Sequence, residues 1–405
     1  MSDSDGPRLT FVGRLFMLGF LAVCGSGAWY LFNKPNASQN NNSDVTPPSG
    51  AAAKSNPGQK ESIPCTLRIA YGTEKKRWLE WAVEQFANTP QGRDIKIELI
   101  PKGSIEGARA TVNEKEKIHV WTPASSAYRD VFVQEWALNH NGAPFLKEEP
   151  LALSPMVFVF WEERYEAFVR KYKDVSFATV NEALHEPGGW QGITEKPEWG
   201  FFKFGISDPN QSNSGLLTLV LAAQQFRVKN TRLTMSDVVD ADFNQWLKGF
   251  ARSLAGLGNS TGNMMRDMVL KGPATYDALM VYESVVIDYL KNAEGRWGSL
   301  HVAYPALNIW NDNPYYIINA DWLGPDERRA AESFLTFLLG EPAQKQALVH
   351  GYRPAEPNIS LKQSDSPFTL YRKNGLRIEI PSVCDAPPAE VITNLLTGWQ
   401  RARGQ

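Results

Sequence analysis

Polar side chains at the ends of two expected strands are the first candidates for chemistry in this sequence. Thr73 follows the apolar run CTLRIAYG, and Ser125 and Ser126 follow the run IHVWTPA. In α/β proteins, ligands bind in the loops at the carboxyl ends of parallel strands. We therefore expect these three hydroxyl groups to contact a ligand.

A helix that starts near residue 213 offers a second kind of binding group. The strand KFGIS leads through DPNQSNSG into the apolar run LLTLVLAAQQF, and Asn213 and Ser214 stand just before that run. The free N–H groups and partial positive charge of a helix N-terminus make it a site for anions. The plainer role of such residues is to cap the helix. Both roles place these side chains at the helix N-terminus.

No motif in the chain indicates catalysis. The pattern G-x-S-x-G occurs at 258–262, but a hydrolase elbow needs a strand before the serine, and Ser260 follows the helical stretch FARSLAGLG. The five histidines lack H-E-x-x-H or i, i+4 spacing. There is no Walker loop and no glycine-rich dinucleotide motif after the first strand. We expect no enzyme activity and no cofactor, and a transport ATPase would be a separate chain.

Composition limits the partner classes. The formal net charge is -2, from 42 basic and 44 acidic residues. This balance gives no electrostatic reason to expect nucleic acid as a partner. Apart from its N-terminal segments, the chain has about 340 residues, which is enough for roughly two domains.

An uncharged segment at 15–32, LFMLGFLAVCGSGAWYLF, is long enough to be nearly a full membrane crossing. Arg8 and Arg14 precede it, and Trp29 and Tyr30 lie near its far end. This arrangement predicts a single-pass anchor in the cell membrane, with the folded region on the periplasmic or extracellular side. Residues 1–14 would then be cytoplasmic.

A lipoprotein signal is the competing interpretation of that segment, because Leu21-Ala22-Val23-Cys24 is similar to a lipobox with Cys24 as the lipidated residue. Residues 33–62 are rich in Asn, Ser, Pro and Gly and have few large apolar side chains. We expect them to form a disordered tether. Cys65 and Cys384 lie near the two ends of the region that follows, where they could form a disulfide in an oxidising compartment or remain free thiols.

Apolar periodicity predicts alternating strands and helices beyond the tether, and hence parallel sheets. Pro155 interrupts the apolar run at 151–161, which argues against a single central strand and for a crossing between lobes. The expected strands are 65–71, 95–100, 118–121, 203–207 and 278–282, and the expected helices include those around Trp78 to Phe86, 216–226, 243–257, 284–290, 325–338 and 389–401.

The order of these segments resembles the type II periplasmic solute-binding family from about residue 65 to the end. The specific marks are TPASSAY at 122–128, ALSPMVFVF, DPNQSNSGLLTLVLAA, VYES at 281–284 and NPYYI. The resemblance implies an α/β fold with two lobes, each a mostly parallel sheet flanked by helices. Its expected divisions are a first part of lobe 1 at 63–153, lobe 2 at 154–300, and a return to lobe 1 with C-terminal helices at 301–405.

Within that family the sequence is most similar to the molybdate- and sulfate-type binders. The resemblance implies ligand contacts from Thr73, Ser125, Ser126, Asn213, Ser214, Ser260, Thr261 and Tyr282. Neutral donors that converge from several helix ends can hold an oxyanion without a cationic side chain. Thr73 stands where a serine is common, however, and Glu283 would repel an anion if it pointed inward. The solute could therefore also be an amine or a larger polar molecule.

The expected function is capture of a small solute for delivery to a membrane permease and ATPase of the ABC type. The lobes would close about a hinge at two crossings, near 151–160 and 301–309. The alternative is a membrane-tethered sensory or scaffold head that keeps this fold but acts through a protein partner.

Overall fold

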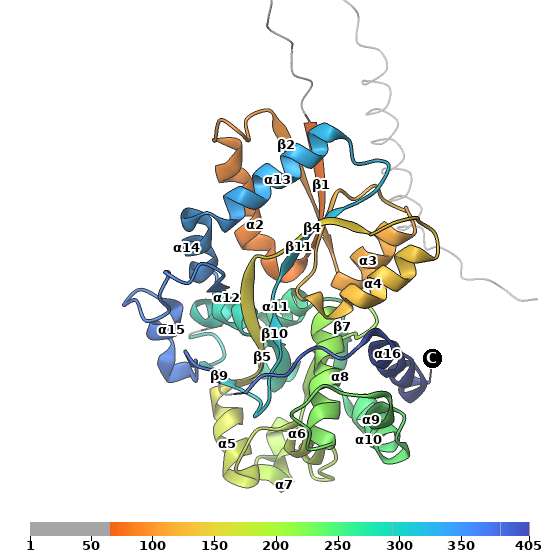
Figure 1. Cartoon of the computed structure of the whole chain (residues 1–405). Coiled ribbons are helices and arrows are strands. Elements are labelled where there is room, and N and C mark those ends of the chain that lie inside the picture. The colour runs from red at the N-terminus through yellow and green to blue at the C-terminus, as the bar shows by residue number, and fades with distance from the viewer. Residues whose placement is uncertain (1–64, 294, 381, 405) are drawn as a thin grey trace, which may run out of the picture. The chain divides into compact units, whose positions relative to one another are not determined.

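The computed structural model describes residues 65–404 apart from 294 and 381, and these residues are organised around two β-sheets (Figure 1). The expected anchor at 15–32, Cys24 and the tether at 33–62 lie outside the described residues. Within the described part of the chain, no helix is long and apolar enough to cross a membrane.

The first sheet has the strand order β2-β1-β3-β11-β4. Its strands are β1 (Cys65–Gly72), β2 (Ile95–Lys102), β3 (Val120–Thr122), β4 (Phe145–Pro150) and β11 (Pro314–Ile318). The first three are parallel to one another, and β11 runs antiparallel to both β3 and β4. The strands predicted around 65–71 and 95–100 are confirmed, and the third is two residues later than its predicted start.

Helices α2 and α13 cover the apolar side of β1 and β2. The predicted periodicity of α2 is confirmed, because Trp78, Leu79, Ala82 and Phe86 are all buried, and Phe86 packs on Phe334 of α13 with ring centroids 5.2 Å apart. The helical elements of this lobe are η1 (Thr73–Lys75), α2 (Lys76–Ala87), α3 (Ser104–Val112), η2 (Ser126–Tyr128), α4 (Arg129–Ala137), α13 (Pro325–Leu339) and α14 (Glu341–Val349). We call this sheet with these helices the first lobe.

The second sheet has the strand order β10-β5-β8-β6-β7, and two further strands, β9 and β12, also pair with β5. Strands β6, β7 and β8 are parallel, whereas β5 is antiparallel to β8. The strands are β5 (Ala152–Trp161), β6 (Phe204–Ser207), β7 (Gly256–Gly258), β8 (Ala278–Tyr282), β9 (Leu300–Ala303), β10 (Trp310–Asn311) and β12 (Arg353–Pro354).

Helix α8 (Asn213–Phe226) is the central helix of the second lobe, which we define as the second sheet with its helices. Every residue of α8 from Asn213 to Gln224 is buried, which explains why its sequence is apolar all round rather than on one face. The other helices of this lobe are α5 (Glu162–Tyr172), α6 (Phe177–Leu184), α7 (Trp190–Thr194), α9 (Met235–Val238), α10 (Ala241–Ser253), α11 (Thr261–Lys271), α12 (Glu283–Ala293) and α16 (Ala389–Arg403).

Strand β5 corrects one expectation from the sequence. It is a single ten-residue strand that continues through Pro155, although a proline was expected to prevent this. The Ser154 carbonyl and the Met156 N–H and C=O groups bond to Asn311 and Asn308 on the β10 side, so the missing N–H of Pro155 is directed to the other side. It is tolerated there because the ladder with β8 begins only at Met156. The segment does cross between the two sheets, as predicted.

The chain passes between the lobes at adjacent places. One crossing leads from β4 into β5, a second leads from β10 into β11 at Asn311–Pro314, which is C-terminal to the expected position at 301–309, and a third leads from α14 into β12. Asn311 pairs with Ser154, so the first two crossings lie side by side, and β12 also pairs with β5. The residues after 301 contribute to both lobes, since β9 pairs with β5 while α13 packs against β1 (Figure 1).

The two described cysteines are free thiols, and the structure does not contain the disulfide considered between them. Cys65 starts β1 in the first lobe. Cys384 is buried in the core of the second lobe, where its Sγ donates to the carbonyl oxygen of Asn308 at 3.4 Å. The two residues belong to different hydrophobic clusters, which is why proximity to the two ends of the folded region did not bring them together.

Candidate functional site

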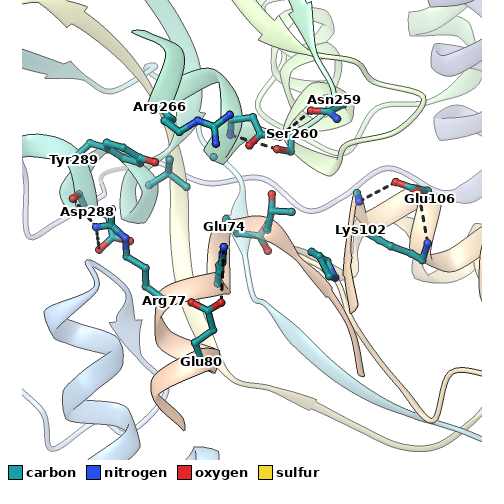
Figure 2. Close-up of a pocket in the computed structure, with 17 residues that line it drawn as sticks. Glu74, Arg77, Glu80, Lys102, Glu106, Asn259, Ser260, Arg266, Asp288 and Tyr289 are labelled. Carbon is teal, nitrogen blue, oxygen red and sulfur yellow. Dashed lines mark hydrogen bonds and ion pairs between the residues drawn. The ribbon is translucent and has the colours of Figure 1, made fainter. Parts of the chain in front are cut away.

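A cavity of about 580 Å³ lies between the two lobes. Residues from the first lobe that line it include Thr73, Glu74 and Arg77, and those from the second lobe include Ser260, Arg266 and Tyr289. Figure 2 shows Glu74 and Arg77 on one wall, facing Ser260, Arg266 and Tyr289 on the other. A volume of this size suits a small organic ligand.

Thr73 and Ser260 are the predicted residues that line this cavity. Thr73 begins η1, directly after β1. Opposite it lies Gly262 of α11, at which a Cβ atom would be 3.9 Å from Thr73 Oγ1. Ser260 is the N-cap of α11, and its Oγ accepts from the backbone N–H of Asn263 at 3.3 Å. The two lobes therefore approach each other at these two loops.

An ion pair that the sequence reasoning missed holds the loop after β1. Lys75 is fully buried, and its Nζ donates to Glu74 Oε1 at 2.6 Å, to the carbonyl oxygen of Pro123 at 3.0 Å and to Asn313 Oδ1 at 3.2 Å. Burial lowers the pKa of Lys75, and the charge of Glu74 opposes that shift. An ammonium has three protons, so these contacts use all of them.

Ser125 and Ser126 lie on the neighbouring loop of the first lobe, where their polar groups are already engaged. Ser125 Oγ accepts from the backbone N–H of Ala127 at 3.1 Å, as a cap of η2. The backbone N–H of Ser126 donates to Asp312 Oδ1 at 2.8 Å. Asp312 therefore occupies the amide that an anionic ligand would use.

Ser214 and Thr261 belong to a chain of buried hydroxyl groups that links two helix N-termini of the second lobe. Ser214 Oγ lies 2.5 Å from Ser207 Oγ and 3.1 Å from Ser212 Oγ, and it also contacts Thr261 Oγ1. Ser214 is completely buried and Thr261 almost so. These hydroxyl groups satisfy one another at the points where free helix N–H groups were expected to meet a ligand.

Asn213 connects α8 to Tyr282 of β8 and to Asn311 at one of the crossings between the lobes. The Nδ2 group of Asn213 donates to the Tyr282 hydroxyl at 3.5 Å and to Asn311 Oδ1 at 3.4 Å. Asn213 Oδ1 is buried and has no hydrogen-bond partner among the described residues. Burial raises the pKa of Tyr282 well above its ordinary value, and the charge of Glu74 adds to this shift. Tyr282 therefore lies within electrostatic range of the Glu74 carboxylate.

Glu283 does not point into the cavity, contrary to the concern raised by its position beside Tyr282. Its carboxylate is fully buried and accepts from Arg353 Nε and Nη2, both at 2.9 Å, and from the Tyr304 hydroxyl. Burial raises the pKa of Glu283 and the guanidinium of Arg353 opposes that shift. The bidentate pair joins α12 to β12 and keeps this charge away from the solute.

Direct contacts tie the two lobes together at the edge of the cavity. Arg77 Nη1 donates to the carbonyl oxygen of Asp288 at 3.2 Å, and its guanidinium carbon lies 5.3 Å from the centre of the Tyr289 ring (Figure 2). A Cβ atom at Gly103 would lie only 2.3 Å from the carbonyl oxygen of Gln211. Glycine at position 103 thus permits close approach of the first lobe to the second.

The serine in the G-x-S-x-G pattern does follow a strand, contrary to the expectation from the sequence. Strand β7 (Gly256–Gly258) comes directly before it and α11 directly after it. Ser260 nevertheless has ordinary extended dihedral angles, φ -153° and ψ 151°. None of the hydrogen bonds that join its side chain to described residues involves a histidine. The strand–turn–helix context is present, but no histidine in the part of the chain that the structure describes is hydrogen-bonded to this serine as a catalytic base would be.

The structure brings the predicted residues together only in part. Thr73 and Ser260 face the cavity, Asn213, Ser214, Thr261 and Tyr282 form a connected buried cluster, and Ser125 and Ser126 join Asp312. Sequence reasoning missed Glu74 and Lys75. The signal available for them was two oppositely charged residues directly after Thr73, at the end of a buried strand. No group of three or more His, Cys, Asp or Glu side chains among the described residues could hold a metal ion.

A family model matches most of this chain. The family model described as bacterial extracellular solute-binding protein matches residues 67–353. No curated protein matches this chain significantly.

Solved structures share the fold at low sequence identity. A periplasmic thiamin binding protein has a TM-score of 0.56 and 15% identity, covering 83% of this chain and 96% of its own. The sulfate-binding protein SubI from Mycobacterium tuberculosis H37Rv has a TM-score of 0.51 and 16% identity, covering 84% and 99%. Iron-bound HitA from Pseudomonas aeruginosa has a TM-score of 0.54 and 13% identity, covering 84% and 99%.

Proposed function

Because this chain belongs to the bacterial extracellular solute-binding protein family, we propose that it captures a small solute in the cavity between its two lobes. The resemblance of the sequence to type II periplasmic binding proteins is confirmed by the family match and by the shared fold. Members of this family are binding proteins rather than enzymes.

The proposal rests mainly on the position of the cavity between the two lobes. One wall comes from η1 and α2 of the first lobe, and the other comes from α11 and α12 of the second. The connections between the lobes run side by side at β5 and β10. Two lobes joined by adjacent strands can rotate about those strands and close on a ligand, as in hinge motions of binding proteins.

Thr73 and Ser260 are our candidates for solute contacts from the two lobes, since both line the cavity. The buried cluster of Asn213, Ser214, Thr261 and Tyr282 lies behind them. We propose that the loaded protein presents its solute to a membrane permease with an ATPase of the ABC type. An anchor at 15–32 or a lipid on Cys24 would keep it near that partner on the periplasmic or extracellular side.

Isothermal titration of the full chain, purified in mild detergent, tests solute capture. The titrants are one set each of oxyanions, amines, amino acids and sugars. We expect saturable binding of one member with one site per chain. A ligand at about 100 times its dissociation constant should stabilise the protein by about 2.7 kcal/mol, which a thermal-shift measurement would detect. The absence of any binding or thermal shift across all four sets would refute the proposal.

A further inference from the structure

We infer that the solute carries a positively charged nitrogen, of the ammonium or guanidinium type, and that the Glu74 carboxylate is its main binding group. This inference rests on the proposed function and names the class of solute for the same cavity. It differs from the oxyanion expected from the sequence, and five features of the structure favour it.

The first feature is the position of Glu74. This carboxylate lines the cavity, yet its side chain is only 6% exposed. It lies directly over Gly72, where a Cβ atom would be 2.1 Å and 2.5 Å from its two oxygens. Lys75 binds Oε1, and no hydrogen bond from a described residue engages Oε2. A partly desolvated carboxylate oxygen facing a cavity attracts a cation more strongly than it would in water.

The second feature is that the buried ammonium of Lys75 has no proton left for an anion. Its three donors are used by Glu74, Pro123 and Asn313. Lys75 also does not line the cavity, whereas Glu74 does. Of the two members of this ion pair, the acid is the one presented to a solute.

The third feature is the state of the donors that an oxyanion would need. The Ser126 amide is bound by Asp312, and the Ser125 hydroxyl accepts from an amide of its own loop. The Ser214 hydroxyl is held in the chain with Ser207 and Thr261. Displacing these partners would cost hydrogen bonds that a bound oxyanion would have to replace.

The fourth feature is that Asn213 leaves an acceptor, not a donor, without a partner. Asn311 Nδ2 donates to the carbonyl oxygen of Ser154 at 2.7 Å, which fixes Asn311 Oδ1 as an acceptor. The atom of Asn213 that faces Asn311 Oδ1 must therefore be its NH₂ group. The buried Asn213 Oδ1 that remains can accept only from an N–H or O–H donor, although Asn213 itself does not line the cavity.

The fifth feature is the balance of charge around the hinge and the η1 loop. Glu74 and Asp312 contribute two negative charges that act on Lys75, which contributes one positive charge. Glu283 is neutralised by Arg353. The charged side chains that line the cavity as a whole are balanced, with four acids (Glu74, Glu80, Glu106 and Asp288) and four bases (Lys76, Arg77, Lys102 and Arg266). The local excess of negative charge is therefore confined to the η1 loop, where Glu74 would attract a cation. A metal ion fits less well, because the Lys75 ammonium already lies 2.6 Å from Glu74.

Arg266 represents the competing possibility, since it lines the cavity and an anion could bind to its guanidinium. Its side chain is 57% exposed and lies 4.0 Å from Asp267. A guanidinium so open to water holds an anion only weakly. We therefore assign the main contact to Glu74 and use Arg266 as an arm of the test.

Titration calorimetry on the full chain tests this inference with named probes: putrescine, choline, lysine and arginine as cations, sulfate, molybdate and citrate as anions, and maltose as a neutral solute. At least one cationic probe should bind. Glu74→Gln should weaken it by about 30-fold or more, because the solute's charge then loses its partner. Glu84→Gln is the matched control, since Glu84 also lies on α2, is exposed and does not line the cavity, and it should change affinity by less than about threefold.

The double variant Glu74→Gln/Lys75→Met guards against misfolding, because it removes both charges of the buried pair together. It should fold and show the same loss of cation binding. Arg266→Gln removes a positive charge from the cavity lining and should therefore keep or raise the affinity for a cation.

The outcomes separate the two levels of the proposal. Binding of an anionic or neutral probe in place of the cations would overturn the cation inference and leave solute capture standing. Retained cation affinity in the double variant would overturn the role of Glu74. No binding by any class would refute the proposed function itself. The ranking of probes on the wild-type protein decides the charge class even where a variant fails to fold.

Discussion

Replacing Gly72 with alanine should destabilise the protein through the Glu74–Lys75 pair. The backbone of Gly72, with φ -65° and ψ 132°, suits any residue, so alanine carries no conformational strain. The added methyl group would, however, stand 2.1 Å and 2.5 Å from the Glu74 oxygens. The carboxylate must move, and the completely buried Lys75 then loses its counter-charge.

The expected size follows from two opposing contributions. Breaking a buried ion pair costs about 3–5 kcal/mol, and a compatible Gly→Ala change returns about 0.4–1 kcal/mol through the unfolded chain. We expect a net loss of about 2–4 kcal/mol in the free energy of unfolding. Urea denaturation of the full chain, followed by tryptophan fluorescence, measures this loss.

Two further variants test the mechanism of that loss. In a Lys75→Met background, Gly72→Ala should cost less than about 1 kcal/mol, because no buried ammonium is left unpaired. Gly249→Ala is the control, since a Cβ atom there would have its nearest neighbour at 3.6 Å. An unchanged stability of Gly72→Ala, or an equal loss with and without Lys75, would show that Glu74 is not held as described.

Three more predictions follow from other parts of the molecule. Asp277→Ala should lower the free energy of unfolding by about 3–5 kcal/mol in urea denaturation. This fully buried carboxylate accepts from Arg164 Nε at 2.9 Å, Trp190 Nε1 at 3.0 Å and the Lys203 amide at 2.8 Å. Glu163→Gln, at an exposed partner of Arg164, should change the free energy of unfolding by less than about 0.5 kcal/mol, and equal effects of the two variants would contradict the prediction. Gly103→Ala should hold the lobes apart, because the new methyl group would lie 2.3 Å from the Gln211 carbonyl oxygen. It should weaken solute binding in calorimetry by about tenfold or more, with little loss of stability. Full affinity in this variant would show that close approach of Gly103 to Gln211 is not needed for binding. Burial lowers the pKa of His119 below 6.5, so the unfolded chain binds more protons just below pH 6.5 and the free energy of unfolding should fall as pH drops from 7 to 5. His119→Gln should reduce this dependence of stability on pH, to which one group contributes at most about 1.4 kcal/mol per pH unit. An unchanged dependence in the variant would refute the prediction.

The strands and helices with strong periodicity could be predicted from the sequence. The spacing of Trp78, Ala82 and Phe86 predicted α2, and the apolar run after Ser214 predicted α8. Both predictions succeeded because burial in the core alone determines which positions of these helices are apolar. Strand β7 was missed because it has three residues, two of them glycine, and follows a helix closely. Pro155 misled because its tolerance in β5 depends on which strand lies beside it, and no local pattern reveals that neighbour.

The site was less predictable, for a physical reason. Sequence position placed Thr73, Ser125 and Ser214 near strand ends and helix starts, and the structure agrees. Whether such groups are free to meet a ligand depends on partners far along the chain. Ser126 is bound by Asp312, and Lys75 is bound by Asn313, at separations that no local pattern can report. These long-range contacts decide which polar groups of the site remain available to a ligand.

The most direct test of the central claim is the distance between the two lobes with and without solute. Glu84→Cys on α2 and Lys248→Cys on α10 place spin labels on exposed sites of the first and second lobes, with native cysteines replaced by serine. Double electron–electron resonance on the full chain would compare the two states. Closure of the lobes on the solute should give a shorter and narrower distance distribution when a solute is bound. An identical distribution at saturating solute would contradict capture by closure of the two lobes.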